Sequence, residues 1–340
     1  MKKSLIALAI ASAVSAPAFA ATSNVDVYGK LHFAITSYDD NMSSSTANDV
    51  NFSSNASRIG FKGVEDLGGG LKGLWQIESG VNLDEQTGTL ASRNSFVGLQ
   101  GGFGTVLLGN HDTPLKLVGR AVDLFGDTVA DSRNVMSNAH DARAQNVVAY
   151  ISPTFSGVSI IAAYTNDLAG GTSPAPDAEN ESAYNLSVTY TNGGLYLGAA
   201  YGDGDQNNTI GLNADWRLAA GYTFGNFKLV GQYDAQNADT VAVGDYTSWM
   251  VGGAYTMGNV VLKANYMLGE FGNSQVAGGA DKEQYTFGVD YNLSKRTGVY
   301  ALYALGDNVT FGGGAGDSDQ VAGRAGEYLG AFSVGVTHSF

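Results

Sequence analysis

The sequence contains no cysteine and is poor in histidine and proline. Its 340 residues include four histidines and five prolines, against 47 glycines. The lack of cysteine rules out thiol catalysis, Cys-ligated zinc and iron–sulfur clusters, although a chain of this length can bury enough surface to fold without disulfides. The abundance of glycine disfavours long helices. Disulfide scaffolds and Cys-based sites are therefore excluded.

Long apolar runs are also missing after residue 20. The first 20 residues, MKKSLIALAIASAVSAPAFA, combine Lys2 and Lys3 with an apolar stretch and end in the small-residue pattern Ala18-Phe19-Ala20. This is the layout of a secretory signal peptide, whereas a membrane anchor needs roughly 20 uninterrupted apolar residues. We expect cleavage after Ala20, which leaves residues 21–340 and, with two lysines removed, changes the formal charge from −14 to −16.

Alternation of apolar and polar residues dominates the rest of the chain. In NADWRLAAGYTFG (213–225), Trp216 and Leu218 share one face, and Asp215 and Arg217 share the other. The stretch EQYTFGVDY repeats the pattern. Successive side chains of a strand point to opposite faces, so this period of two predicts β-strands.

Strand length and connections favour a membrane barrel over a soluble β-sandwich. Most alternating segments run about 9 to 13 residues, near the length that a tilted strand needs to cross a bilayer and longer than the usual soluble strand of roughly 5 or 6. Many carry Tyr, Phe or Trp at their ends, as in the aromatic girdles of such barrels. Short connections such as Gly225-Asn226 alternate with long ones such as 271–282. The asymmetry fits periplasmic turns and external loops.

The segments give the predicted barrel its size. We predict sixteen strands, near 24–38, 55–66, 70–83, 91–101, 104–110, 145–153, 156–166, 183–192, 194–203, 212–224, 226–236, 245–257, 259–270, 282–293, 295–307 and 328–340. The last must pair with the first, because an open sheet edge cannot lie in hydrocarbon. In this closing strand Phe332, Val334 and Val336 face lipid, and Phe340 is expected at the interface.

Four motifs follow one another along the chain: VDVYGKLHF (25–33), SRIGFKGVEDLGGGL (57–71), SRNSFVGLQGGFGTVLLGNHDTPL (92–115) and QNVVAYISPTFSGV (145–158). In this order and spacing the sequence resembles the general (non-specific) porins of Gram-negative outer membranes over essentially the whole mature chain. The aromatic Phe340 matches a signature that such proteins use for outer-membrane assembly. Asn110 departs from the family, in which many members have an arginine before the third loop.

The resemblance implies a homotrimer of sixteen-stranded antiparallel barrels, each a water-filled channel for passive diffusion of ions and small hydrophilic solutes. It also implies contact with outer-membrane lipid and lipopolysaccharide; we expect no cofactor, no metal and no nucleic acid. The family's third loop folds into the barrel and narrows it. Here that loop is 111–144, and a connection this long is normally functional or disordered. Its predicted constriction residues are Asp123, Asp127 and Asp131.

Strand parity places basic side chains on the lumen wall. If Phe61 faces outward, Arg58 and Lys62 face the lumen. If Phe96 faces outward, Arg93 faces the lumen. The predicted basic set is Lys30, Arg58, Lys62, Lys72, Arg93 and Arg143. Glu78 joins the three loop aspartates as the acidic set. Opposed charges of this kind produce a transverse field that orients dipolar solutes. The same parity puts Asn94 on the outer face, where a neighbouring subunit would satisfy it.

Two features predict opposite ion preferences. The basic wall taken alone favours anions. The net charge of the mature chain is strongly negative, and we expect it to lie largely in loops and mouths, where it sets the ion concentration within a Debye length of roughly 10 Å at 0.1 M salt. Mild cation selectivity is the resulting expectation.

Other functional classes find less support in the sequence. Asp203, Asp205 and Asn207 begin like a calcium loop, but Asn208 and Ala214 stand where an EF-hand needs Gly and Glu. A barrel enzyme needs a serine activated by histidine, and no histidine lies in a recognisable catalytic motif, so no enzymatic activity is expected. A substrate-specific channel, or an adhesin that uses its external loops, stays open as the alternative.

Overall fold

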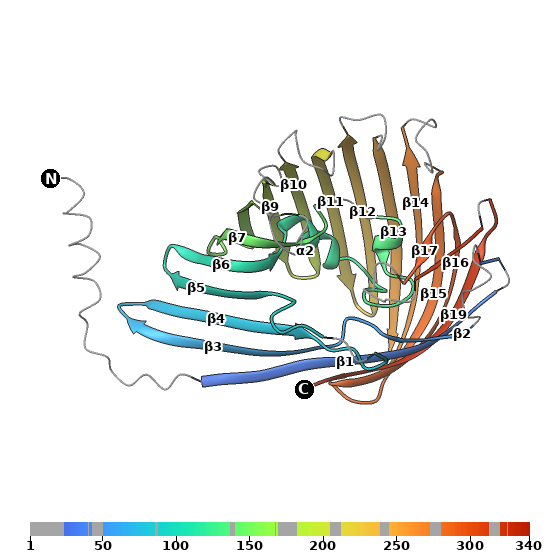
Figure 1. Ribbon diagram of the computed structural model, residues 1–340, viewed down its shortest axis with the longest axis horizontal. Helices are drawn as coiled ribbons and strands as arrows, with labels where there is room; N and C mark the ends of the chain where they lie inside the picture. Colours follow the sequence, from blue (N-terminus) through green and yellow to red (C-terminus); the bar gives the residue numbers. More distant parts are fainter. Residues whose placement is uncertain are drawn as a thin grey trace.

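In the computed structural model most of the chain forms one antiparallel β-sheet (Figure 1). The structure describes residues 24–39, 41–42, 50–85, 88–136, 140–166, 168, 182–204, 212–238, 245–272, 280–312, 320–324 and 326–340. The predicted signal peptide, residues 1–20, lies outside the described residues.

The strands are longer on average than those of soluble sheets. They are β1 (Asn24–Tyr38), β2 (Val50–Ser54), β3 (Arg58–Gly68), β4 (Leu71–Gly80), β5 (Ser95–Gly101), β6 (Gly104–Asp112), β7 (Arg143–Ile151), β8 (Val158–Thr165), β9 (Ala183–Asn192), β10 (Leu195–Gly204), β11 (Leu212–Phe224), β12 (Phe227–Ala238), β13 (Tyr246–Met257), β14 (Val260–Phe271), β15 (Lys282–Asn292), β16 (Thr297–Asp307), β17 (Thr310–Phe311), β18 (Val321–Ala322) and β19 (Leu329–Ser339). The helices of the described part of the chain are α2 (Pro114–Arg120) and the short 3-10 helix η1 (Ser132–Asn134). Within the described residues, no helix has the length and apolar character to cross a membrane.

The two ends of the sheet meet at β1. One edge of β1 pairs with β19, from Lys30↔Ser339 to Tyr38↔Ala331. Its other edge pairs with β2 and then with β3, which therefore share one position in the sheet. The 17-stranded sheet of the described residues thus closes into a barrel with sixteen strand positions. The predicted sixteen-stranded antiparallel barrel is confirmed.

The second strand position is occupied by two strands, β2 and β3, with a break between them. The prediction gave a single strand, 55–66, at this position and no break. Ala56 has a φ of 51°, in the left-handed region, and the regular pairing stops around it. The Ser57 hydroxyl donates to the His32 carbonyl at 3.0 Å and accepts from the His32 N–H at 2.9 Å. The His32 carbonyl also accepts from the Asn55 N–H at 3.1 Å, so the Ser57 side chain replaces only the backbone acceptor of the His32 N–H. A pattern of apolar and polar residues cannot reveal such a replacement.

The outer face exposes apolar side chains in register across neighbouring strands. Val27 pairs with Phe61, and Phe61 pairs with Ile77. All three are 38–55% exposed. Only a lipid-facing surface places contiguous apolar side chains outward on every strand, so this face fits a bilayer.

The orientation of β5 is the reverse of the predicted one. Val97 pairs with Trp75 and is 59% exposed, so it faces outward. Phe96 pairs with Gln76 and packs with Leu107 in an inner apolar cluster. The prediction that Phe96 faces outward is therefore wrong. Apolar residues of both parities occur in this short strand, so alternation alone does not decide its orientation.

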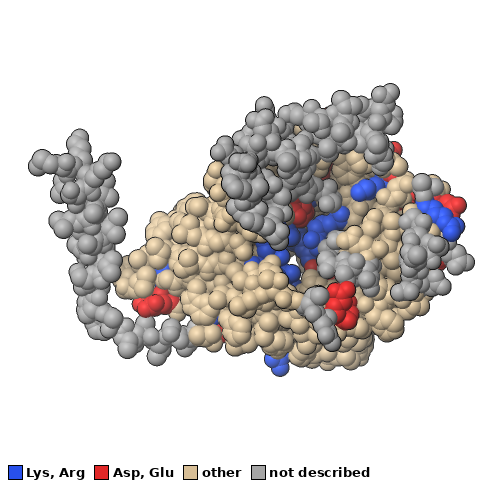
Figure 2. Space-filling view, viewed as in Figure 1, with Lys and Arg blue, Asp and Glu red and all other residues tan. Residues whose placement is uncertain are grey.

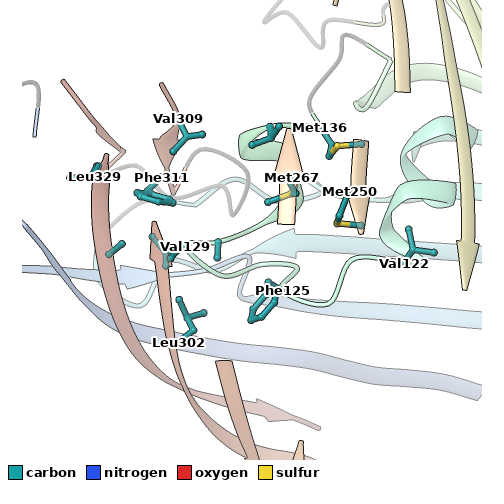
Figure 3. Close-up of a cluster of buried hydrophobic side chains, with 14 of the residues drawn as sticks. Val122, Phe125, Val129, Met136, Met250, Met267, Leu302, Val309, Phe311 and Leu329 are labelled. Carbon is teal, nitrogen blue, oxygen red and sulfur yellow. The ribbon is translucent and has the colours of Figure 1, made fainter. Parts of the chain in front are cut away.

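A second apolar cluster lies inside the barrel (Figure 3). Val129 and Met136, from the connection between β6 and β7, pack there with Met250 of β13 and Met267 of β14. Phe311 joins them from the pair β17–β18, which forms in the connection between β16 and β19. Two connections therefore cover part of the inner faces of β13, β14 and β16.

Candidate functional site

Residues 113–136 and 140–142, the described part of the connection between β6 and β7, lie against the inner wall of the barrel. The helix α2 of this connection starts at an N-cap, where the Thr113 hydroxyl accepts from the Lys116 N–H at 3.2 Å, and packs on β9, β10 and β11. Further along, the Tyr246 hydroxyl donates to the Val135 carbonyl at 2.8 Å. The Lys263 Nζ donates to the Leu124 carbonyl at 2.9 Å. We call residues 113–136 and 140–142 the inner loop.

The opposite side of the inner loop reaches β1 and β3 through Asp127. Its Oδ2 lies 3.1 Å from Lys30 Nζ and 3.8 Å from Arg58 Nη1. Asp127 has a φ of 61°, a conformation that aspartate tolerates better than most residues because its side chain bonds locally. Two predicted basic residues and one predicted acidic residue thus meet directly, as an ion pair rather than across an open gap.

Glu78 of β4 forms the next contact along the wall. Its Oε1 accepts from Arg93 Nε at 2.6 Å, and its Oε2 accepts from the Tyr28 hydroxyl at 2.9 Å. Arg58 Nε lies 4.0 Å from Oε2, so Arg58 links Glu78 to Asp127. Glu78 therefore lies on the wall and partly neutralises the positive charge of Arg58 and Arg93.

The inner loop also carries two arginines, Arg120 and Arg133, that were not among the predicted basic residues. Arg120 pairs with Asp127 and, at 2.7 Å, with Asp131, and it lies 3.7 Å from Asp123. Arg133 Nε donates to Asp131 at 2.9 Å. The loop is therefore not a uniformly acidic surface. The sequence offers no signal for these pairs, because α2 ends at Arg120 and only the fold of the loop beyond it brings Asp127 and Asp131 back to the guanidinium.

Burial and these partners determine the pKa values of the loop carboxyls. Burial by itself raises the pKa of Asp127. The positive charges of Arg120 and Lys30 lower it by more than burial raises it, so the pKa of Asp127 lies well below the ordinary range. Burial and then the charge of Asp131 raise the pKa of Asp123 to about 6. Asp127 consequently stays ionised while Arg120 and Lys30 are charged.

Asp112, at the end of β6, forms a neighbouring group of ion pairs. Lys116 Nζ and Arg143 Nη2 each lie 3.2 Å from its Oδ1. The Asn94 amide donates to Asp112 at 3.1 Å, and its oxygen accepts from Arg143 Nε at 2.8 Å. Asn94 therefore faces the interior, and its predicted position on the outer face is wrong. It precedes β5, so strand parity does not extend to it.

Two of the predicted basic residues lie apart from these pairs. Lys62 Nζ sits 5.2 Å from the Tyr28 ring centroid in a cation–π contact. Lys72 lies opposite Gln100 near the turn between β3 and β4, roughly 20 Å along β4 from Glu78 at about 3.3 Å per residue. Lys72 therefore lies far from the ion pairs described above, opposite Asp66 of β3.

The ion-paired side chains of the wall from β1 to β7 and of the inner loop between Lys116 and Arg133 are together called the charged cluster. The separate ion pairs of Arg217 with Asp141 and Asp234, and of Lys263 with Asp290, are not part of it. It consists of the cations Lys30, Arg58, Arg93, Lys116, Arg120, Arg133 and Arg143 and the carboxylates Glu78, Asp112, Asp123, Asp127 and Asp131. These seven cations and five carboxylates give a formal charge of +2.

The two signs of charge differ in exposure. Apart from Lys116, the cationic side chains of the charged cluster are 20–28% exposed, while its carboxylates are 0–16% exposed. Figure 2 shows Lys and Arg side chains, with fewer Asp and Glu side chains, around an opening in the molecule. Water in this opening therefore meets mainly guanidinium and ammonium groups, with the carboxylates behind them.

No group of three or more acidic or histidine side chains in the described part of the chain is placed to hold a metal ion. The charged cluster is arranged as paired ions along an opening. What it can do chemically is attract, repel and orient solutes that pass it.

A closed barrel with an apolar outer face and a charged interior defines a β-barrel membrane channel. The sequence matches the family model described as Gram-negative porin over residues 7–310, and the chain belongs to this family. It is a multi-pass protein of the Gram-negative outer membrane.

Curated relatives and solved structures agree with this assignment. Major outer membrane protein P.IB of Neisseria meningitidis serogroup B is 31% identical over 358 aligned positions, which cover 100% of both chains. The same-named protein of Neisseria lactamica is 30% identical, also over 100% of both. The structure of an anion-selective porin from Comamonas acidovorans matches with a TM-score of 0.75 and 26% identity, over 94% of this chain and 100% of that one. The trimer form of OmpT from Vibrio cholerae matches with a TM-score of 0.70, 21% identity and coverage of 94% and 99%.

Proposed function

We propose that the protein is a passive diffusion channel for ions and small hydrophilic solutes, narrowed at the charged cluster. The observation that carries this proposal is the contact of Asp127 on the inner loop with Lys30 and Arg58 on the wall. This contact joins opposite sides of the barrel interior. Solutes crossing the barrel then pass the exposed faces of Arg58, Arg93 and their neighbours.

The arrangement of charges favours anions at this narrow part. The exposed groups are cationic and the carboxylates lie behind them, so an anion in the opening has the nearer attractive charges. The similarity to a porin described as anion-selective supports the same sign. This proposal replaces the expectation of mild cation selectivity, which rested on the net charge of the whole chain rather than on which charges face the water.

The sign of the reversal potential tests the selectivity. With the purified mature protein in a planar bilayer and a salt gradient of potassium chloride across it, we expect the reversal potential on the anion side. The preference should weaken as salt rises, because the Debye length falls from roughly 10 Å at 0.1 M to 3 Å at 1 M. A cation-side potential throughout this range would mean that charges outside the charged cluster control permeation.

We further propose that three copies associate through the outer face of β1 to β6. Among the described residues, the exposed large apolar side chains of these strands include no tyrosine or tryptophan. The outer face from β7 onward carries many, such as Tyr164, Trp216, Tyr222 and Tyr291. Tyr and Trp belts mark lipid interfaces. The outer face of β1 to β6 has exposed Phe52 and Phe61 and a partly buried Trp75. With no exposed Tyr or Trp among its described residues, it suits contact with another subunit, and the face from β7 onward, rich in Tyr and Trp, suits lipid and lipopolysaccharide.

Single-channel recordings test the channel and the trimer together. We expect the purified protein to insert as units that open in triplets, with a conductance roughly proportional to salt concentration because the pore is aqueous. β-rich circular dichroism without any conductance steps would contradict the channel proposal. Steps of single size, never grouped in threes, would contradict the trimer alone.

A further inference from the structure

Arg217 of β11 is buried inside the barrel with all its hydrogen-bond donors used. A guanidinium has five N–H groups in a fixed fork. The Nε and Nη2 groups donate to the two oxygens of Asp234 at 2.9 and 2.5 Å, and Asp234 lies directly opposite on β12. The side chain of Arg217 is 0% exposed. Two donors therefore fix the orientation of the guanidinium on the wall.

The remaining three donors of Arg217 bind the inner loop at both of its ends. Nη1 donates to the Leu115 carbonyl at 3.1 Å and to the Asp141 carboxylate at 2.6 Å. Nη2 donates to the Met136 carbonyl at 3.0 Å. One wall residue thus holds the beginning and the end of the inner loop, and a charged donor makes each bond stronger than a neutral one.

Gly119 of α2 permits this contact. A Cβ at Gly119 would lie 2.4 Å from Arg217 Nη1, closer than atoms can approach. Glycine is unfavourable inside a helix relative to alanine, so its position in PLKLVGR is explained by the guanidinium beneath it. The neighbouring Val118 also meets the wall, since a Cβ at Gly198 of β10 would lie 2.9 Å from its Cγ1.

We propose that Arg217 is a positioning residue that sets the aperture of the channel by holding both ends of the inner loop on β11 and β12. This inference rests on the proposed channel function. The far part of the loop is held separately by Lys263, whose Nζ donates to the Leu124 carbonyl and lies 4.7 Å from the Phe125 ring centroid. Loss of the Arg217 contacts therefore frees the base of the loop, widens the passage beside the charged cluster and lets the aperture vary.

The first test changes the contact without changing any charge. Gly119→Ala pushes the loop away from the guanidinium, while alanine favours the helix itself. We expect a larger mean unit conductance and a broader distribution of unit conductances. Gly221→Ala is the control. It also adds one methyl group, on the inner face of β11 that carries Arg217, but there the nearest atoms are 3.8 Å away. It should conduct like the unsubstituted protein.

The second test asks for rescue by an independent link. Arg217→Met should raise and broaden the conductance in the same way. Adding Val118→Cys and Gly198→Cys to this variant allows a disulfide between loop and wall, since the 2.9 Å separation is near the roughly 3 Å between a Cβ and the far sulfur of a disulfide. The chain has no other cysteine. Oxidation with diamide should restore the original conductance, and reduction with dithiothreitol should remove the rescue.

The outcomes separate this inference from the proposed function. If the unsubstituted protein conducts but Gly119→Ala behaves like Gly221→Ala, Arg217 does not set the aperture. The same conclusion follows if the disulfide forms, as shown by mass, and the conductance stays at the value of Arg217→Met. Absence of conductance in the unsubstituted protein overturns the channel itself.

Discussion

Deleting Phe340 is expected to reduce assembled protein in the outer membrane by at least about tenfold. The Phe340 N–H donates to the Gly29 carbonyl and its carbonyl accepts from the Gly29 N–H, both at 3.1 Å. These bonds join β19 to β1, the pairing that closes the barrel. Each backbone bond contributes about 1 kcal/mol net, and the deletion removes both together with an interfacial aromatic ring.

The Phe340 ring provides a second reason for this effect. It covers Gly29, where an added Cβ would lie 2.5 Å from the ring. Phe340→Asp keeps the backbone but places a charge at the interface, so it should impair assembly as well. Phe340→Tyr is the control, because it retains the aromatic ring and should assemble normally. The measurement is the amount of heat-modifiable oligomer in outer-membrane fractions; normal oligomer from the deletion variant would refute the assembly role.

Replacing Arg93 with glutamate is expected to move the channel from anion to cation preference. The change reverses one partly exposed charge. It also removes the partner of Glu78, whose Oε1 lies 2.6 Å from Arg93 Nε in the unsubstituted protein. A unit charge about 5 Å from a permeating ion in water changes its energy by roughly 0.8 kcal/mol. Since cation and anion respond oppositely, the permeability ratio should change by roughly tenfold or more. Arg93→Ala should give about half the shift in reversal potential.

Two further variants serve as controls for this shift. Lys72→Ala removes a positive charge on β4 outside the charged cluster, so it should leave the reversal potential nearly unchanged. Asp127→Asn removes a carboxylate from the charged cluster and should shift the potential further toward anions. Equal shifts from Lys72→Ala and Arg93→Ala would show that the net charge of the lumen, rather than the charged cluster, determines selectivity.

The strands themselves were predictable because each carries its own evidence. Alternation in 213–225 reports two faces of a strand, and a strand of this length with aromatic ends suits a bilayer. The observed β11, Leu212–Phe224, corresponds closely to the predicted 212–224. The prediction failed where local patterns are ambiguous: Phe96 and Val97 are both apolar, and Asn94 lies outside the strand whose parity was applied to it.

The charged cluster was predictable only in part. Lys30, Arg58 and Glu78 could be assigned to the interior from strand parity. Arg93 also faces the interior, but its assignment rested on an outward Phe96, which is wrong, and it precedes β5. The partners of these residues could not be assigned, because Asp127 reaches Lys30 across 97 residues of sequence. The neutralising role of Arg120 also depends on how the inner loop folds back on itself. Composition therefore suggested an acidic loop, whereas folding pairs its carboxylates and leaves cations at the surface.

The sequence by itself determined that this chain is a sixteen-stranded membrane barrel, because alternation, strand length and turn chemistry are properties of neighbouring residues. Only the tertiary structure decided which charges face the opening and what holds the inner loop. In the sequence, Arg217 is one polar residue of an alternating strand. In the structure it donates hydrogen bonds to the carbonyls of Leu115 and Met136, which lie 102 and 81 positions away along the chain. Such contacts arise when the barrel closes around its own loop, and burial then makes each unpaired charge costly enough to select its partner.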